Sequence, residues 1–366
     1  MTIPCCERAM ENKFKQPSNC NFVAQPKLSI CIATYNRAKF IGETLDSILS
    51  QMEPGIELVV VDGASPDNTS EVMAEYTLRY PALRYFRETE NSGIDGDYDK
   101  AVGYAASEYC WLMTDDDLLR PGAVRRVLDK LDGDYDLVVV NAEIRNADFS
   151  KVLDEKLIRL DFDREYGAGD EESLFLETTQ GLSFIGCVVI RRDVWLARDR
   201  RSYYGSLFVH VGVIFQHLPI ARATLITEPL ITIRYGNAMW TPRGLEIWII
   251  KWPELVWSFV DFSDKAKSIV CPRGGWHLIK RLMFYRATGA YTTEEYNNIL
   301  RTKVSGLTRF ASKLVSIVPI FLASLLASIH CTVLRGRGAR MIMTSLVCGR
   351  YTNFVTRWAA RTVGVC

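Results

Sequence analysis

The chain has 366 residues, of which 48% are hydrophobic and 24% are charged. This balance is that of a globular protein and excludes a disordered one, and the length suggests about two domains. The net charge of +1 hides an asymmetry, because residues 301–366 carry ten Lys and Arg and no Asp or Glu. We therefore expect an anionic partner for this last segment, and its apolar content favours a membrane surface over a nucleic acid.

The first 24 residues show no apolar period and contain a cluster of turn-forming residues around Pro17 and Ser18. We expect them to be a loose leader. The ten cysteines include no Cys-x-x-Cys pattern, and the start of the chain does not resemble a secretory signal peptide. We therefore expect reduced thiols in a cytosol.

Apolar segments and amphipathic segments alternate through the first third of the chain. Strands are predicted over 27–34, 57–62, 83–87 and 109–113, and helices over 38–51, 69–80 and 97–106. Alternation at this pitch predicts βαβ units and a parallel sheet with right-handed crossovers.

Each predicted strand is followed by a polar loop, and the loops are 34–37, 62–67, 91–99 and 114–117. The carboxyl ends of parallel strands lie at one edge of the sheet, where open α/β sheets bind ligands. We expect these four loops to converge there.

Three consecutive carboxylates, Asp115, Asp116 and Asp117, follow the strand 109–113. In an extended segment Asp115 and Asp117 would point the same way. Two such oxygen donors can hold Mg²⁺ or Mn²⁺ while a substrate diphosphate completes the coordination, so an acidic site need not repel an anion. Alternatively, the acids cap the helix that follows Pro121.

Asp62 ends the second strand, where it could accept hydrogen bonds from a nucleobase or ribose or, alternatively, cap a turn. Farther on, a strand is predicted over 136–141, an irregular stretch over 146–170, and a second strand over 181–190. The two glycines of that last strand indicate close approach by a ligand or a neighbouring segment.

Trp248, Trp252 and Trp257 lie near one face of a predicted helix, either as core residues or as an aromatic wall for an acceptor. The stretch Leu314–Ile329 has sixteen residues without a charged side chain, with basic residues at both ends. It is shorter than the roughly 20 residues that cross a bilayer. We expect an in-plane or re-entrant anchor or, alternatively, a buried helical hairpin.

Four motifs occur in order: Ser29–Arg37, Val59–Thr69, Asn91–Gly93 and Asp115–Asp117. In this order and spacing they resemble the family-2 inverting glycosyltransferases of the GT-A fold, strongly over 27–120 and loosely over 180–240. The portion 183–257 is most similar to bacterial sugar transferases of surface-polysaccharide assembly, including abequosyltransferase-like proteins. The resemblance implies an α/β fold with a mainly parallel, Rossmann-like twisted sheet covered by helices on both faces. We expect a GT-A domain over 25–240 and a helical region over 241–366.

The resemblance also implies roles for residues, which follow the family's motifs. The nucleotide site would be lined by Thr34, Tyr35, Arg37 and Asp62, with Asn91 and Gly93 near ribose or phosphate. Asp115 and Asp117 would flank a diphosphate bound through Mn²⁺ or Mg²⁺, with Asp117 as the direct ligand and Asp116 beside the nucleotide-sugar. Many relatives have Ala-Arg-Asn where this chain has Asp97-Tyr98-Asp99, so the sugar contacts of Asp97 stay open.

The family's acidic base pair is replaced here by Phe208-Val209-His210. An inverting transfer needs a group that takes the proton of the attacking hydroxyl, and a neutral imidazole with a pKa near 6.5 suits this role. His210 could instead contact the metal or phosphate, or belong to the core. Asp199 is the reserve base, although its Arg-rich surroundings are also typical of a surface ion pair.

The sequence therefore predicts a metal-dependent inverting transferase that moves a sugar from a nucleoside diphosphate to a hydroxyl of a lipid-linked glycan. We expect it at the cytoplasmic face of a membrane, in polysaccharide or O-antigen-type biosynthesis, with no nucleic acid partner. The alternatives are an inactive sugar-nucleotide-binding or scaffold protein and a sugar nucleotidyltransferase. The latter should show a Gly-rich basic loop after the first strand, where this chain has Thr34–Arg37. The pattern does not favour a dinucleotide-dependent oxidoreductase, because Gly93 and Gly96 do not form its glycine fingerprint.

Overall fold

The computed structural model describes residues 26–366 apart from 221, 237–242, 335–337, 350 and 366. The predicted leader over 1–24 lies outside the described residues. In the described part, ten strands form one sheet with the order β3-β2-β1-β4-β9-β6-β10-β5, while β7 pairs with β6 and β8 with β10. The strands are β1 (Leu28–Thr34), β2 (Ile56–Asp62), β3 (Leu83–Arg87), β4 (Tyr109–Met113), β5 (Leu118–Leu119), β6 (Leu137–Asn146), β7 (Val152–Asp154), β8 (Arg164–Tyr166), β9 (Val188–Arg191) and β10 (Ala223–Tyr235).

The sheet has a parallel half and a mixed half. β3, β2, β1 and β4 are parallel neighbours, and every residue of β1, β2 and β4 is buried, which explains their continuous apolar sequences. β9 runs antiparallel between β4 and β6, and β10 is parallel to β6. The predicted α/β class and parallel sheet are therefore confirmed.

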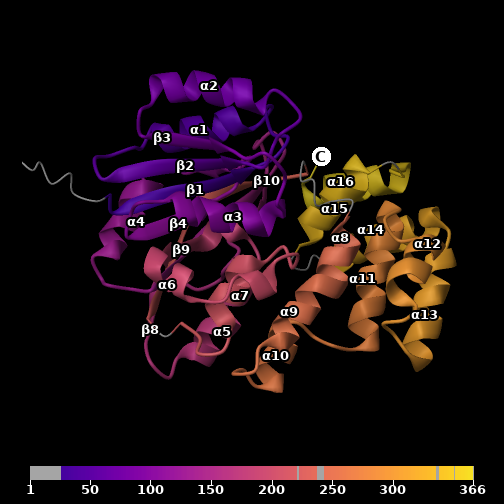
Figure 1. The fold of residues 1–366 in the computed structure, drawn as a ribbon. Helices are drawn as coiled ribbons and strands as arrows, with labels where there is room; N and C mark the ends of the chain where they lie inside the picture. The colour runs from indigo at the N-terminus through magenta and orange to yellow at the C-terminus, as the bar shows by residue number, and fades with distance from the viewer. Residues whose placement is uncertain (1–25, 221, 237–242, 335–337, 350, 366) are drawn as a thin grey trace, which may run out of the picture.

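The helices of this part lie on both sides of the sheet (Figure 1). They are α1 (Ile41–Leu49), α2 (Thr69–Arg79), α3 (Gly93–Tyr104), α4 (Ala123–Leu131), α5 (Glu171–Leu182), α6 (Arg192–Ala197) and α7 (Val209–Phe215). The strand order reverses between β1 and β4, because β2 and β3 follow on one side of β1 while the chain returns through α3 to β4 on the other. This switch point places the loops after β1 and β4 next to each other.

The strand that we predicted over 181–190 is largely wrong. Gly181 and Leu182 are the last two residues of α5, and only β9 over Val188–Arg191 is extended. The expected close approach at a glycine is nevertheless present, because a Cβ at Gly181 would lie 2.4 Å from Cγ1 of Ile158. The stretch 146–170 holds the short strands β7 and β8, and β6 continues past the predicted end at 141 to Asn146.

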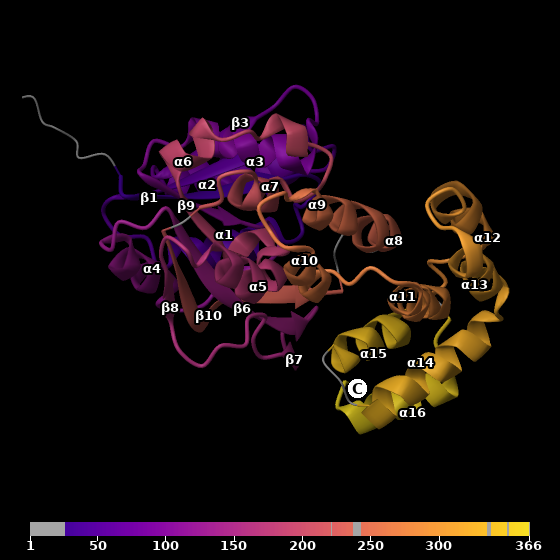
Figure 2. The same ribbon diagram turned by 90° about the horizontal axis from the view of Figure 1, so that it is seen from below.

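After β10 the chain is helical. The elements are α8 (Gly244–Glu246), a π-helical turn (Ile247–Lys251), α9 (Trp252–Ser258), α10 (Asp264–Val270), α11 (Gly275–Thr288), α12 (Thr293–Glu295), a second π-helical turn (Tyr296–Leu300), α13 (Gly306–Ile317), α14 (Ile320–Leu334), α15 (Ala339–Cys348) and α16 (Phe354–Val363). Most buried apolar residues as far as Cys271 belong to the main core, whereas α11 to α16 contribute to two smaller clusters, one of which also includes Leu245, Ile249 and Ile250. The domain boundary at 240 stays a prediction. Figure 2 shows α11 to α16 as a body beside the sheet.

Two C-terminal expectations can be compared with the structure. Trp252 is buried, and its ring centroid lies 4.9 Å from that of Phe208. This tryptophan is therefore a core residue, which was one of the two alternatives. The stretch Leu314–Ile329 is divided between α13 and α14, whose axes differ by 106°. Among the described residues no single helix is long and apolar enough to cross a membrane, although α13 and α14 satisfy the length and composition test as a bent pair.

The Gly181 contact gives a stability prediction. We expect Gly181→Ala to lower the free energy of unfolding by about 1–3 kcal/mol, because the added methyl group overlaps Ile158, a residue 2% exposed. The control is Gly103→Ala in α3, where a Cβ meets nothing within 4 Å. That change should stabilise the protein by up to about 1 kcal/mol, since alanine is the better helix former. Equal effects of the two substitutions in thermal unfolding would contradict the packing of α5 on Ile158.

Candidate active site

The loops after β1 and β2 are hydrogen-bonded to each other. The amide of Asn36, a residue in the left-handed region with φ 59°, donates to Oγ of Ser65 at 2.9 Å. The amide of Arg37 donates to Oγ1 of Thr69 at 3.1 Å. Thr34 is buried directly opposite Asp62 in the register of the two strands, and Tyr35 is half-buried after it. The predicted convergence of these two loops is therefore observed.

The first turns of α3 and the residues just before it close against the same place, and α3 begins at Gly93 rather than at the predicted residue 97. A Cβ at Gly63 would lie 2.6 Å from Oδ2 of Asp97 and 3.5 Å from Oδ1 of Asn91, so the approach depends on glycine. Oδ1 of Asn91 accepts a hydrogen bond from the amide of Gly93 at 2.7 Å, and Oδ1 of Asp97 accepts one from the hydroxyl of Ser92 at 2.5 Å. Asn91, Gly93 and Asp97 thus lie beside the loop after Asp62.

Asp62 is fully buried and both of its carboxylate oxygens accept hydrogen bonds. Oδ1 accepts from the amide of Ser65 at 2.7 Å, and Oδ2 accepts from the hydroxyl of Tyr85 at 2.6 Å. The turn-capping alternative is confirmed. The contact of Asp62 with a nucleobase stays a prediction, and it would require one of these oxygens to accept a further bond.

The three aspartates do not alternate as an extended chain would. The backbone bends at Asp115 and Asp116, and both side chains face Arg37: its Nε is 3.4 Å from Oδ1 of Asp115, and its Nη2 is 3.3 Å from Oδ2 of Asp116. Asp117 has different partners. Its carboxylate accepts a hydrogen bond from the amide of Arg234 at 2.6 Å and another from the hydroxyl of Thr114. The bend ends the two-residue period, so the argument from an extended segment does not apply here, and the pairing of Asp115 with Asp117 at a metal stays a prediction.

Arg234, at the end of β10, is a site residue that we did not predict. Its guanidinium is buried, donates to the carbonyl oxygens of Asp116 at 3.0 Å and Ala147 at 2.9 Å, and pairs with Glu43. Its Cζ lies 4.1 Å from the ring centroid of Phe149. The signal in the sequence is the single arginine of a strand that is otherwise apolar and threonine-rich except for Glu228. It joins α1, β10 and the loop after β6 to the aspartates.

Burial makes the aspartate cluster electrostatically unfavourable without a cation. The pKa of Asp115 is raised to about 7, chiefly by burial and then by the charge of Asp116, although Arg37 opposes the rise. Burial also raises the pKa of Asp117 well above its usual value. Carboxylate oxygens are the ligands that Mg²⁺ and Mn²⁺ prefer, so the residues present fit such an ion. Within the described ranges no three His, Cys, Asp or Glu side chains could hold an ion alone, so a substrate would have to complete the coordination.

Two further acids on α3, the buried Asp95 and the half-buried Asp99, bind segments that precede or begin α7, and neither was predicted. Asp95 accepts hydrogen bonds from three amides, those of Gly205 at 2.8 Å, Leu207 at 2.9 Å and Val209 at 3.0 Å. One turn later Asp99 accepts from Nε1 of Trp195 at 2.8 Å. An acidic pair four residues apart on one helix face was the available signal.

The side chains of His210 and Asp199 make their hydrogen bonds with residues outside the four loops. The ring of His210 is 1% exposed, its Nε2 lies 2.7 Å from the carbonyl oxygen of Leu182, and burial lowers its pKa to about 4. This environment favours the core alternative over the base. Asp199 is exposed, and its Oδ1 accepts from the amide of Ser202 at 3.2 Å. Its contacts are those of a surface turn.

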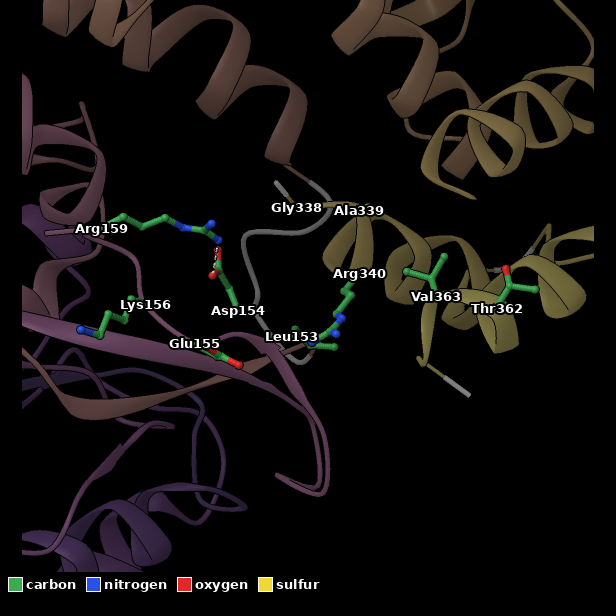
Figure 3. A pocket seen from close by; sticks show the side chains of 10 residues that line it. All are labelled: Leu153, Asp154, Glu155, Lys156, Arg159, Gly338, Ala339, Arg340, Thr362 and Val363. Atoms are coloured by element: carbon green, nitrogen blue, oxygen red, sulfur yellow. Dashed lines mark hydrogen bonds and ion pairs between the residues drawn. The ribbon is translucent and has the colours of Figure 1, made fainter. Parts of the chain in front are cut away.

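A cavity of about 510 Å³ lies elsewhere, between the segment 153–159 and the ends of α15 and α16 (Figure 3). Its lining includes Arg159, which pairs with Asp154 at 2.8 Å, and Arg340. None of the predicted site residues lines it. The acidic loops, rather than this cavity, are therefore the candidate site.

Comparisons with known proteins agree with this location. Residues 29–195 match the model of glycosyl transferase family 2. The chain contains a family-2 glycosyltransferase domain. The glycosyltransferase is 25% identical over 230 residues to the abequosyltransferase RfbV of Salmonella typhimurium, covering 59% of this chain and 69% of RfbV. It is 28% identical over 138 residues to the GalNAc(5)-diNAcBac-PP-undecaprenol beta-1,3-glucosyltransferase of Campylobacter jejuni, covering 37% of this chain and 45% of that protein.

The fold also has solved counterparts. Residues 1–349 of S. aureus TarS superpose with a TM-score of 0.51 at 14% identity, covering 87% of this chain and 90% of that one. TarS has also been solved in complex with UDP and with UDP-GlcNAc. At this identity the likeness shows the fold, and the expected GT-A fold is confirmed.

The raised pKa of Asp115 predicts a pH-dependent effect on the stability of the metal-free glycosyltransferase. A carboxyl whose pKa is about 7 in the folded state and 3.8 in the unfolded state holds an extra proton when folded, so its stabilising effect is lost as the pH rises through 7. We expect Asp115→Asn to raise the Tm at pH 8 and to change it little at pH 4, measured by calorimetry with EDTA. A lower Tm at pH 8 would show that the pairing with Arg37 outweighs the burial of the charge.

The burial of His210 predicts that its substitution is kinetically mild. Glutamine can keep a donor toward the carbonyl of Leu182, so His210→Gln should retain turnover within about threefold of wild type. Loss of a general base costs about 10²–10⁴-fold, and such a loss in a variant with an unchanged Tm would restore His210 as the base. Asp199→Asn is the parallel test of the reserve residue.

Proposed function

We propose that this protein moves a sugar from a nucleoside diphosphate to a hydroxyl of a glycan acceptor. The observation that carries the proposal is the cluster of buried carboxylates at the switch point of the sheet, inside the region matched by the family model. Ligands of open α/β sheets bind at such a point.

The donor would lie across the loops that converge at this edge. We assign its nucleoside to Thr34, Tyr35, Arg37 and Asp62, with Asn91, Gly93 and Asp97 near ribose and phosphate. Gly63, between these groups, lets the loops of Asp62 and Asp97 come together. Arg37 is the cation already present, and a phosphate oxygen could replace one carboxylate as its partner.

The metal assignment follows the geometry of the bend. We propose Asp115, with Asp116 beside it, as the side that faces Mn²⁺ or Mg²⁺ and the diphosphate, because these two side chains share Arg37. Asp117, first expected as the direct ligand, is 2% exposed and accepts from Thr114 and the Arg234 amide. We therefore assign it to holding the loop. When bound, the cation would neutralise charge on the departing diphosphate.

The acceptor is proposed from the relatives. RfbV is named as an abequosyltransferase and the Campylobacter jejuni protein as an enzyme acting on a PP-undecaprenol-linked glycan. We propose that the acceptor is a lipid-linked glycan of polysaccharide or O-antigen-type biosynthesis. We therefore also propose that the protein acts at the cytoplasmic face of the membrane. We also propose inversion, in which the hydroxyl attacks the anomeric carbon opposite the diphosphate. The product should then have the anomeric configuration opposite to that of the donor.

The second candidate function is an inactive sugar-nucleotide-binding or scaffold protein. The observation that favours it is the burial of His210 at the place where relatives have an acidic pair. Turnover separates the two, because a binding protein would be stabilised by a donor with Mn²⁺ but would release no nucleoside diphosphate.

The experiment is a donor panel. UDP-, GDP-, CDP- and dTDP-sugars are screened with Mn²⁺ for a rise in Tm, and the best donor is then used to measure nucleoside diphosphate release. We expect Asp115→Ala to lower release at least 100-fold, since the charge on the leaving group loses its counter-ion. The matched control is Asp132→Ala, whose side chain is 86% exposed, and it should leave release unchanged. Release that is the same in both variants and in EDTA would refute the proposed site.

A further inference from the structure

The helix α14 has small residues on its inward face and large apolar residues on its outward face, whereas a helix of a water-soluble protein has large apolar residues inside and polar residues outside. Its inward face consists of small residues, among them Ala323, Ser324, Ala327 and Ser328, each at most 2% exposed. Its outward face carries large apolar residues instead. Small and hydroxyl-bearing residues at a helix interface, with large apolar ones outside, are typical of helices packed in a lipid environment.

The inward face is closely packed on α16. Oγ of Ser324 lies 3.1 Å from Oγ1 of Thr356, and Oγ of Ser328 donates to the carbonyl oxygen of Ser324 at 2.8 Å. Small side chains let the two helices approach, and the hydroxyls find partners inside the contact. The orientation of α14 is therefore fixed, and its outer side chains face away from this contact.

The outer face of α14 consists of the exposed residues Phe321 (61%), Leu322 (44%), Leu326 (46%), Ile329 (48%) and Val333 (71%). No charged residue occurs between Ile320 and Leu334. Exposed apolar surface of this extent marks an interaction site.

The preceding helix continues this surface around the bend. Leu307, Phe310, Leu314 and Ile317 of α13 are 45–82% exposed, and their spacing of three, four and three residues places them on one stripe. On α16, Phe354 and Trp358 are 83% and 57% exposed, one helical turn apart. Tryptophan prefers the interface between lipid and water. Figure 2 shows α14 and α16 side by side, with α15 between them and the sheet.

Charge selects the partner of this surface. Exposed basic residues lie on the same helices, Arg309 and Lys313 on α13 and Arg357 and Arg361 on α16, and the whole segment 301–366 has no acidic residue. A second copy of the chain would bring the same positive charges together. An anionic lipid surface would instead pair with them, and each basic residue near such a surface strengthens binding.

We propose that the outer faces of α13, α14 and α16 form a docking surface for an anionic lipid bilayer, on which the protein lies without a single spanning helix. A 15-residue α14 is about 22 Å long, so it suits a position in the headgroup and acyl boundary. This docking surface rests on the proposed function in one respect, because a lipid-linked acceptor is the reason for the enzyme to bind a membrane.

The test is co-sedimentation of the full chain with two kinds of vesicle, phosphatidylcholine alone and phosphatidylcholine with about 30% phosphatidylglycerol, whose anionic headgroups give a negative surface potential. Wild type should bind the anionic vesicles and bind neutral ones much more weakly. The double variant Leu326→Glu/Ile329→Glu should lose at least tenfold in binding. The control Leu78→Glu changes a residue of α2 that is 87% exposed, and it should bind as wild type does.

Two more variants keep the test decisive if the first fails to fold. Phe354→Ser/Trp358→Ser removes the aromatic residues of α16, and Arg357→Gln should weaken binding to anionic vesicles about fivefold. Folded wild type that ignores anionic vesicles, or binding unchanged by these variants, would overturn the proposal. So would a dimer in sedimentation velocity that Leu326→Glu/Ile329→Glu converts to monomer while vesicle binding persists. Nucleoside diphosphate release measured on the same samples is a separate readout, so loss of docking with release intact leaves the proposed function standing.

Discussion

The site depends on three consecutive aspartates, of which Asp116 and Asp117 are buried and Asp115 is half-buried, and two arginines hold them in a bend. Arg37 lies between Asp115 and Asp116, while Arg234 binds the backbone of Asp116 and, through its amide, the side chain of Asp117. The first arginine follows β1 and the second ends β10, so strands from both halves of the sheet are needed to shape one loop. Even with these two arginines, burial and the charge of Asp116 keep the pKa of Asp115 near 7, so the positive charge at the bend does not offset the cost of ionising this carboxyl group. A divalent cation with a diphosphate is the ligand that such a bend would accept most readily.

Much of the fold could be predicted from local pattern. The strands 83–87 and 109–113 have the predicted bounds, because short apolar runs bordered by turn residues carry their own signal. The segment 181–190 failed because its apolar residues belong to three different elements, and what selects among them is the tertiary contact of Gly181 with Ile158. No window of sequence contains that contact.

The site was predictable in its location and less so in its geometry. The convergence of the loops follows from parallel strands, whereas the orientation of Asp117 depends on a bend and on the distant amide of Arg234. The sequence predicted His210 as the base from its position in a motif. Its hydrogen bond with the carbonyl oxygen of Leu182 is visible only in the folded structure. Arg234, Asp95 and Asp99 bind residues that are far away in the sequence, and for this reason the pattern of neighbouring residues did not predict them.

The proposed enzyme therefore combines an acidic edge of the sheet, which binds the donor, with a basic and apolar helical face, which binds the membrane. Its donor site requires Asp115 and Asp116 to hold a divalent cation together with a diphosphate. The most direct measurement of this binding is the electron paramagnetic resonance signal of free Mn²⁺ during titration with a nucleoside diphosphate. We predict that the signal falls when wild-type protein and nucleotide are both present, and that the Asp115→Asn/Asp116→Asn variant leaves it at the level of nucleotide alone. An equal fall with the variant would contradict the account.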